Sequence, residues 1–510
     1  MQLTEIHNRI KRMASDYASP FISAVLCGLA AHTFAFTNKL MNADEVDSLF
    51  GKGATVTSGR WGLEAVKPLL PAQSMPWLYG IITVLLFALS ACLIIRLFDI
   101  RGRLIQILLA GMITVFPSLT GTFCFMFTSS AYALSFLMAV TAVGLFARHK
   151  GRIRWIVSVI LLVLSMGIYQ AYIAVTASFF VLCVFKTALD GENSLKKFIS
   201  DAVKYLAVML ISVGIYLAVT VAVLKLTGSE FNFYVDQNLL DGSSSVSVLG
   251  RIRMAYDFMV YYFSYREFAL ITGEFSRYCH IVLAALCALG VIIAAVNMAR
   301  TRKIYAAAAI LGAVVILPLA IDCLFLAFAK DSIHSLMLYS FVSIYILSAM
   351  LLESVFAGGK LFSRCARDIV YLCVSLAIVS NIYFANGIYL RLYLNYENAY
   401  SFCSVLLDRV QSVEGYDEGC SLAIIGDQDN KMTHFDRYID IGYLQGAQWD
   451  LVNIYSREKF FNYYLGTSIP FAPKEKIAEL QQDERFLEMS EYPYYGSVKK
   501  IDDCIVVRLG

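Results

Sequence analysis

The most regular feature of the sequence is a series of long apolar runs separated by short polar stretches. Each run has about 17–25 residues, and a helix of that length can cross the hydrocarbon core of a bilayer. The runs lie near residues 17–36, 76–98, 104–120, 123–147, 204–226, 276–299, 304–328, 332–353 and 368–389. The sequence therefore predicts an α-helical polytopic membrane protein.

One further apolar stretch, residues 155–186, is too long for one straight span and short for two. Basic residues decide between these possibilities, because Lys and Arg gather in the cytoplasmic loops of membrane proteins. If the stretch is a hairpin that turns at Tyr169 and Gln170, every basic cluster lies on the cytoplasmic side. The clusters lie at residues 9–12, 96–103, 148–154, 186–204, 300–303 and 360–367. The hairpin brings the predicted number of spans to about eleven.

This topology places the N-terminus in the cytoplasm and three larger segments outside. Two of them are the loops 37–75 and 227–275, and the third is the chain after about residue 390. We expect residues 1–389 to form the transmembrane domain and residues 390–510 to form a small extracytoplasmic α/β domain.

The C-terminal part differs in composition, since charged and turn residues return there. Runs of β-branched and apolar residues predict strands at 421–425 and 504–508. The stretch 474–484, which follows a proline, predicts a short helix.

The composition agrees with a membrane protein and excludes other classes. The chain is 58% hydrophobic and 16% charged, whereas soluble domains have roughly 25% charged residues. The net charge of +3 gives no electrostatic case for nucleic-acid binding. The cysteines show no zinc-binding spacing, and we expect no metal. One disulfide is possible among Cys403, Cys420 and Cys504.

The first candidate for chemistry is an acidic segment directly after the first apolar run. Asp44, Glu45 and Asp47 fall within four positions there. A carboxylate at the lipid–water boundary is partly desolvated, which raises its pKa and makes it a better general base. The alternative interpretation is a short interfacial helix that Asn42 caps, with the acidic residues complementing the helix dipole.

The same loop carries Arg60 and Trp61 between two glycines. Arginine suits a phosphate, and an aromatic ring suits the face of a sugar. Glycine would let the backbone approach a ligand. The alternative is an anchor at the headgroup level, where Trp is common.

Two further groups of polar residues are expected on the outer side. Tyr169, Gln170 and Tyr172 lie at the tip of the predicted hairpin, where they either line a sugar-binding cavity or satisfy the backbone of their own turn. Lys330 and His334 lie in a short late loop, where a cation would contact a phosphate unless the loop is simply solvated.

Three segments give the chain a resemblance to a known family. These are residues 42–45 (Asn-Ala-Asp-Glu), 58–62 (Ser-Gly-Arg-Trp-Gly) and 169–172 (Tyr-Gln-Ala-Tyr). With them the chain resembles the GtrII-type glucosyltransferases, the O-antigen serotype-converting enzymes of bacteria and their phages. The resemblance extends over most of the membrane part, roughly residues 15–390.

The resemblance implies a GT-C-like glycosyltransferase of the bacterial inner membrane. Such an enzyme transfers a hexose, here glucose, from a polyprenyl-phosphate donor to a cell-surface glycan on the extracytoplasmic side, and it needs no cofactor. The family's catalytic base would correspond to Asp44 or Glu45, with Asp47 as a further candidate. The sequence departs from the family pattern in the late loop, where Lys330 and His334 stand in place of an arginine-bearing segment.

A flippase or transporter of lipid-linked saccharides is the alternative function. A transporter usually has ionisable residues near the bilayer midplane and repeated halves. This chain has few charges within its apolar runs and no visible repeat, and its carboxylates and aromatic residues gather on one side of the predicted membrane. We therefore prefer the enzyme.

Overall fold

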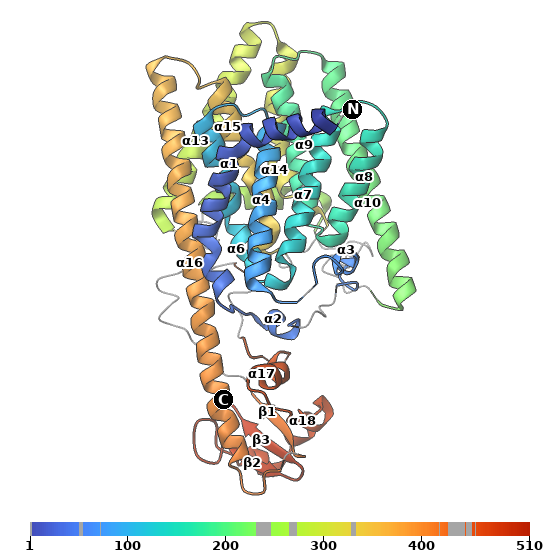
Figure 1. Ribbon diagram of the computed structural model, residues 1–510, viewed down its shortest axis with the longest axis vertical. Coiled ribbons are helices and arrows are strands. Elements are labelled where there is room, and N and C mark those ends of the chain that lie inside the picture. The colour runs from blue at the N-terminus through green and yellow to red at the C-terminus, as the bar shows by residue number, and fades with distance from the viewer. Residues whose placement is uncertain are drawn as a thin grey trace.

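The computed structural model shows a bundle of long helices with a small sheet domain at one end (Figure 1). It describes residues 3–49, 55–71, 73–230, 246–264, 273–327, 333–417, 419–426, 444, 451–453 and 455–510. The bundle helices are α1 (Leu3–Thr37), α4 (Pro76–Leu97), α5 (Arg103–Val115), α6 (Pro117–Phe123), α7 (Met126–Arg148), α8 (Ile153–Ile168), α9 (Tyr172–Leu189), α10 (Leu195–Thr227), α13 (Gly273–Arg300), α14 (Ile304–Ile321), η3 (Ser335–Val342), α15 (Ser343–Ser354) and α16 (Leu361–Gln411).

The number of spans agrees with the prediction of about eleven. Within the described residues, ten helical segments are long and apolar enough to cross a membrane, and the shorter apolar helix α8 is an eleventh candidate. Helices α8 and α9 form the predicted hairpin, which turns at residues 169–171. The protein is therefore a multi-pass membrane protein.

Basic residues gather at one end of the bundle. Helices α4, α7, α9 and α13 each have a basic residue in the last turn there, whereas α10, with Lys225 in its last turn, ends at the opposite end. The last turns of those four helices, and the starts of the helices that follow them, form the end of the bundle nearest the N-terminus, which we call the basic end (Figure 1). The opposite end, which we call the loop end, carries the short helices α2 (Ala43–Asp47) and α3 (Trp61–Val66).

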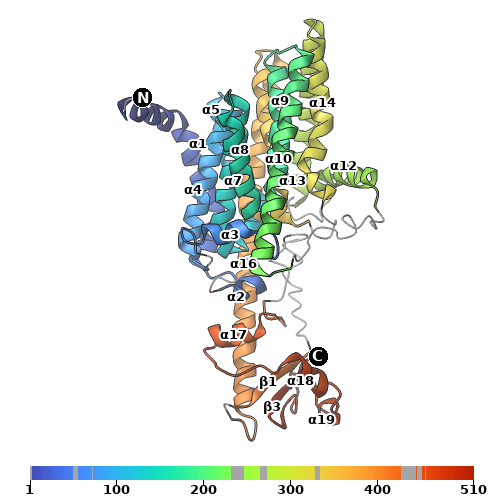
Figure 2. The same cartoon turned by 90° about the vertical axis from the view of Figure 1, so that its right-hand side faces the viewer.

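Two other short elements lie towards the loop end. Helix α12 (Val248–Ser264) runs across the direction of the bundle helices (Figure 2). The 3-10 helix η1 (Cys323–Leu326) follows α14 directly.

Close helix packing depends on small residues and on buried polar contacts. A Cβ on Gly80 of α4 would lie 2.1 Å from the ring of Phe36 in α1, so only glycine permits this approach. His32 of α1 is buried, and its ring nitrogens lie 2.7 Å from the Tyr389 hydroxyl and 2.9 Å from the Thr114 carbonyl. These contacts join α1 to α16 and α5, so the first helix is fixed before it leads into the loop end.

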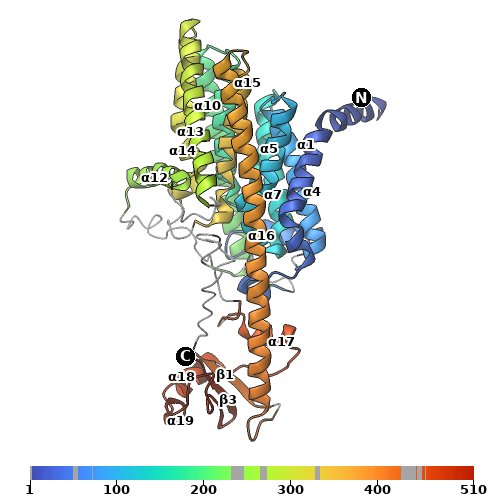
Figure 3. The ribbon, with the colours of Figure 1, turned by 90° about the vertical axis from the view of Figure 1, so that its left-hand side faces the viewer.

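The C-terminal domain is carried by helix α16, which has 51 residues and extends well beyond the bundle (Figure 3). The domain border predicted at residues 389 and 390 falls inside this helix. The sheet has the order β1-β3-β2, with β1 parallel and β2 antiparallel to β3. Its elements are β1 (Ser421–Ile425), α17 (Arg457–Tyr464), α18 (Lys474–Leu480), α19 (Glu484–Leu487), β2 (Val498–Ile501) and β3 (Cys504–Arg508).

The sequence predicts strands β1 and β3 correctly, and helix α18 begins at the predicted residue. Strand β2 has no counterpart in the prediction. Cys403, Cys420 and Cys504 are free thiols, so the disulfide considered for this domain is not formed.

Candidate functional site at the loop end

Helix α2 is short and is fixed by its N-cap. The Asn42 side-chain oxygen accepts a hydrogen bond from the Glu45 backbone N–H at 2.8 Å, and its amide donates to the Cys124 carbonyl. The capping interpretation of the acidic segment is therefore correct for Asn42. The cap residue also ties α2 to the C-terminal end of α6, so the three carboxylates have defined positions.

Glu45 points into the protein and is only 1% exposed. Its carboxylate accepts a hydrogen bond from the Phe127 N–H at 3.4 Å, in the first turn of α7. Burial raises the pKa of Glu45 to about 7, although hydrogen bonds from Ser74 and Phe127 oppose the rise. Glu45 therefore changes charge near neutral pH. Its hydrogen bond with Phe127 joins α2 to the first turn of α7.

We predict that burial of Glu45 makes stability depend on pH. The folded protein holds the Glu45 proton more tightly than the unfolded chain, so stability falls as pH rises from about 4.5 to about 7. Glu45→Gln removes this dependence, which amounts to about 3 kcal/mol over that interval. Thermal unfolding in detergent at several pH values would measure it. Parallel curves for the wild type and Glu45→Gln would contradict the burial of a titrating carboxyl.

Asp44 differs from Glu45 because its side chain is exposed. The surrounding protein still removes part of its hydration and raises its pKa, and the charge of Asp47 adds to the rise. The positive charge of Arg60 acts in the opposite direction. Asp44 is thus an accessible carboxylate within the electrostatic range of Arg60.

Asp47 faces the C-terminal domain. Lys459 of α17 forms an ion pair with the Asp47 carboxylate and donates a hydrogen bond to the Asp47 carbonyl at 3.0 Å. The three carboxylates of α2 therefore have different surroundings: Asp44 is exposed, Glu45 is buried against the bundle, and Asp47 is bound to α17.

Arg60 lies over aromatic residues of the bundle. Its guanidinium donates a hydrogen bond to the Tyr132 hydroxyl at 3.0 Å and lies 5.6 Å from the centre of the Tyr169 ring. The two tyrosine rings stack with their centres 4.1 Å apart. This platform orients the guanidinium by a hydrogen bond and by cation–π attraction.

His334 is the second polar residue near Arg60. It is partly buried and directly precedes η3. Burial and, to a smaller extent, the positive charge of Arg60 together lower the pKa of His334 to about 4. The imidazole is therefore neutral at pH 7, and it can both donate and accept hydrogen bonds. Lys330, predicted to act with it, lies outside the described residues.

Trp61 and Gln170 hold the turn that presents Arg60. The Trp61 indole N–H donates to the Thr220 hydroxyl at 3.1 Å, and its ring covers Gly167, where a Cβ would come within 2.7 Å. The Gln170 amide donates to the Ser58 carbonyl at 2.8 Å. Both side chains therefore support the turn, and their predicted contact with a sugar stays a prediction.

Tyr172 contacts the same group of aromatic side chains. It is buried, and its ring packs edge-on against Tyr169, with the ring centres 5.1 Å apart. Tyr172 therefore helps to hold the Tyr169 ring, over which the Arg60 guanidinium lies.

Several residues of this region carry no separate signal in the sequence. Tyr132 lies within an apolar run, and only the adjacent polar residues Thr128, Ser129 and Ser130 could have suggested a polar face there. Tyr216 of α10 accepts a hydrogen bond from Gln170 at 3.0 Å and donates one to the Gly59 carbonyl at 3.1 Å. Lys459 is 412 positions away from its partner Asp47. Folding alone brings these residues to the site.

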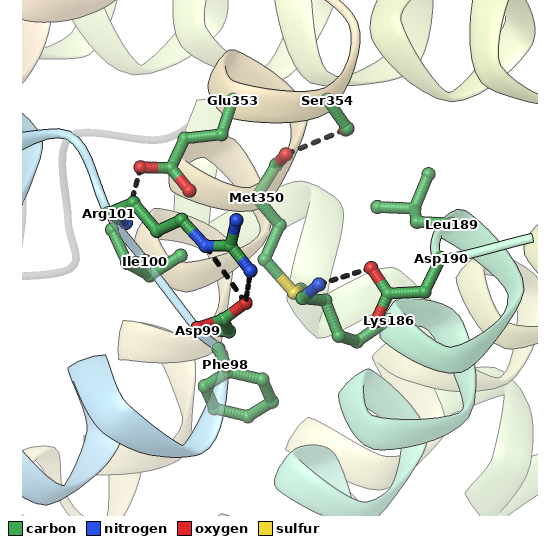
Figure 4. A pocket seen from close by; sticks show the side chains of 10 residues that line it. All are labelled: Phe98, Asp99, Ile100, Arg101, Lys186, Leu189, Asp190, Met350, Glu353 and Ser354. Atoms are coloured by element: carbon green, nitrogen blue, oxygen red, sulfur yellow. Dashed lines mark hydrogen bonds and ion pairs between the residues drawn. The ribbon is translucent and has the colours of Figure 1, made fainter.

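A separate recess of about 240 Å³ lies at the basic end, between α4, α9 and α15 (Figure 4). Its charged residues bind one another: Arg101 pairs with Asp99, and Lys186 pairs with Asp190. Glu353 accepts hydrogen bonds from the backbone N–H groups of Arg101 and Gly102, at 2.6 and 2.5 Å. These contacts link helix ends, and we interpret the recess as structural.

The loop end therefore combines an accessible carboxylate, an oriented guanidinium and a neutral imidazole at one end of a membrane-spanning bundle. In the described part of the chain, no cluster of three or more His, Cys, Asp or Glu side chains is arranged to hold a metal ion. The arrangement suits proton transfer and anion binding, and it defines a membrane protein with a polar site at the end of its helices.

A comparison with protein families indicates which reaction a membrane protein of this kind catalyses. The model of the family described as glucosyl transferase GtrII matches residues 33–347, more than half of the chain. The chain belongs to this family, which indicates glucosyltransferase activity. The matched stretch includes Asp44, Arg60 and His334 but not the C-terminal domain. No curated protein and no solved structure matches the chain significantly.

Proposed function

We propose that the protein transfers a glucosyl group from a polyprenyl-phosphate donor to a cell-surface glycan at the loop end. The observation that carries the proposal is that Asp44 and His334 both lie within the electrostatic range of Arg60. This set offers a base and a phosphate-binding group together, as transfer of a phosphate-linked sugar requires.

Asp44 is the proposed general base. It accepts the proton of the acceptor hydroxyl while that oxygen attacks the anomeric carbon of glucose. The bond between the anomeric carbon and the phosphate oxygen breaks, and polyprenyl phosphate leaves with the bonding electrons. Asp44 then releases its proton to solvent, to which it is exposed. The raised pKa of Asp44 supports this role, because it makes the carboxylate a stronger base.

Arg60 is the proposed partner of the donor phosphate, whose negative charge increases as the leaving group departs. A guanidinium can bind two phosphate oxygens at once and carries its charge at any physiological pH. His334, neutral beside it, would hydrogen-bond a sugar hydroxyl without competing for the phosphate. Trp61 and Gln170 act indirectly in this proposal, through the turn that bears Arg60.

The polyprenyl chain requires a site near the bilayer surface, and α2 follows the first membrane-spanning helix after a few residues. We propose that the loop end faces outward from a bacterial inner membrane. The basic residues in the last turns of α4, α7, α9 and α13 support this orientation, since they would then lie in the cytoplasm.

The test is transfer of label from polyprenyl phosphate that carries radioactive glucose. Cells that express the protein should move label from the lipid fraction to surface glycan, whereas matched cells without it should not. Label that crosses the membrane but remains on the lipid would favour the flippase instead.

A further inference from the structure

The C-terminal domain holds the helix that carries Asp44. Helix α2 has five residues, and a helix of this length is not stable in water by itself. On one side it is tied to the bundle through Asn42 and Glu45. On the other side it faces α17 of the C-terminal domain, as Figures 1 and 2 show. The position of α2 therefore depends on two separate parts of the protein.

The contact with α17 is apolar at its centre. Met41 and Val46 are 1% and 0% exposed, and they belong to a buried cluster that includes Leu406, Phe460 and Phe461. The Tyr464 hydroxyl contacts the Met41 sulfur at the edge of this cluster. The C-terminal domain thus packs against α2 and against Met41, which precedes the N-cap residue of α2.

Lys459 completes the contact at the C-terminal end of α2. Its ammonium group binds both the carboxylate and the carbonyl of Asp47. A cation at this position complements the helix dipole and satisfies a carbonyl that the helix leaves unpaired. The Ser48 N–H, bound to the Asp44 carbonyl at 2.9 Å, links this end of the helix to the proposed base.

Arg60 is held differently. Its contacts with Tyr132 and Tyr169, and the bond from Gln170 to Ser58, all involve the bundle. These contacts of Arg60 are thus with the bundle, whereas Asp44 lies on a helix that the C-terminal domain also contacts. The contact between α2 and α17, together with the bonds of Asn42 and Glu45 to the bundle, sets the separation of the two proposed groups.

We propose that Lys459 is a positioning residue for glucosyl transfer, which places Asp44 relative to Arg60 by holding Asp47. This inference rests on the proposed function of Asp44. It also assigns Asp47 to the attachment of the C-terminal domain rather than to catalysis.

The test compares Lys459→Ala with Lys476→Ala, which removes a lysine of α18 that pairs with Glu479 of its own helix. Lys459→Ala should lower kcat about tenfold to a hundredfold, because a small misplacement of a catalytic group has an effect of that size. The donor KM should not change, since Arg60 remains in place. The unfolding temperature should change little, because the Lys459–Asp47 pair is partly exposed. Lys476→Ala should leave kcat, KM and the unfolding temperature unchanged.

A conservative substitution provides the second measurement. Lys459→Arg keeps a cation that can bind both the carboxylate and the carbonyl of Asp47, so it should retain most of the kcat lost in Lys459→Ala. An unchanged kcat in Lys459→Ala, a loss confined to the donor KM, or a kcat as low in Lys459→Arg as in Lys459→Ala would each overturn the inference. If Lys459→Ala does not fold, Asp47→Asn decides: it removes the charged partner of Lys459 and should lower kcat in the same way, and an unchanged kcat would overturn the inference. A wild-type protein that transfers no glucose would instead refute the proposed function.

Discussion

Asp44→Asn should abolish most of the glucosyl transfer while the protein still folds. Asparagine keeps the shape of the side chain but cannot take up the proton of the acceptor hydroxyl. General bases contribute about 10²–10⁴-fold to the rates of such reactions, so kcat should fall by that factor. The donor KM should change little, because Arg60 remains. Transfer of labelled glucose by purified protein, with unfolding temperatures measured in parallel, would show the effect.

Glu64→Gln is the matched control. Glu64 lies on α3 in the same loop, and it pairs with Lys67 rather than with a residue of the proposed site. This variant should be as active as the wild type. Full activity of Asp44→Asn would remove Asp44 from the mechanism. Loss of activity in Glu45→Gln together with full activity in Asp44→Asn would transfer the role of base to Glu45.

Arg60→Ala should weaken both donor binding and the chemical step. The guanidinium would bind the phosphate in the ground state and stabilise the charge that develops on it as the sugar leaves. Loss of such a charge-stabilising donor lowers rates by about 10²–10³-fold, and we expect kcat/KM for the donor to fall at least that far. Arg60→Lys should recover little, because an ammonium group lacks the planar pair of donors and cannot make the same contact with Tyr132.

Lys67→Ala is the control for loss of a positive charge in the same loop. Lys67 is partly exposed and pairs with Glu64, so its removal should not change kcat/KM. Equal effects of Arg60→Ala and Lys67→Ala would mean that the loop needs only a general positive charge. An effect of Arg60→Ala on the unfolding temperature alone would indicate that Arg60 only supports the fold.

The membrane part of the fold could be predicted from the sequence because the bilayer imposes a simple length requirement. Even the hairpin of α8 and α9 follows from the positions of basic residues, since a single span would have reversed the side of every later cluster. The C-terminal domain was harder to predict. Strand β2 carries Lys499 and Lys500 on an exposed edge, so its apolar pattern is weak.

The chemistry of the loop end could be predicted only in part. Carboxylates and an arginine in one loop indicate a polar site, but the sequence does not distinguish the exposed Asp44 from the buried Glu45. That difference arises from the packing of α2 against the start of α7, which involves Phe127. The aromatic platform under Arg60 and the contact of Lys459 with Asp47 are long-range, and no local pattern marks them.

The most direct test of the central claim is a structure of the protein with a non-reactive polyprenyl-phosphonate analogue of the glucose donor. We expect the phosphonate to contact the Arg60 guanidinium and the anomeric carbon of glucose to face Asp44, with the lipid chain leaving towards the bilayer beside the loop end. Binding of the analogue at the basic end, or anywhere away from Arg60 and Asp44, would contradict the account.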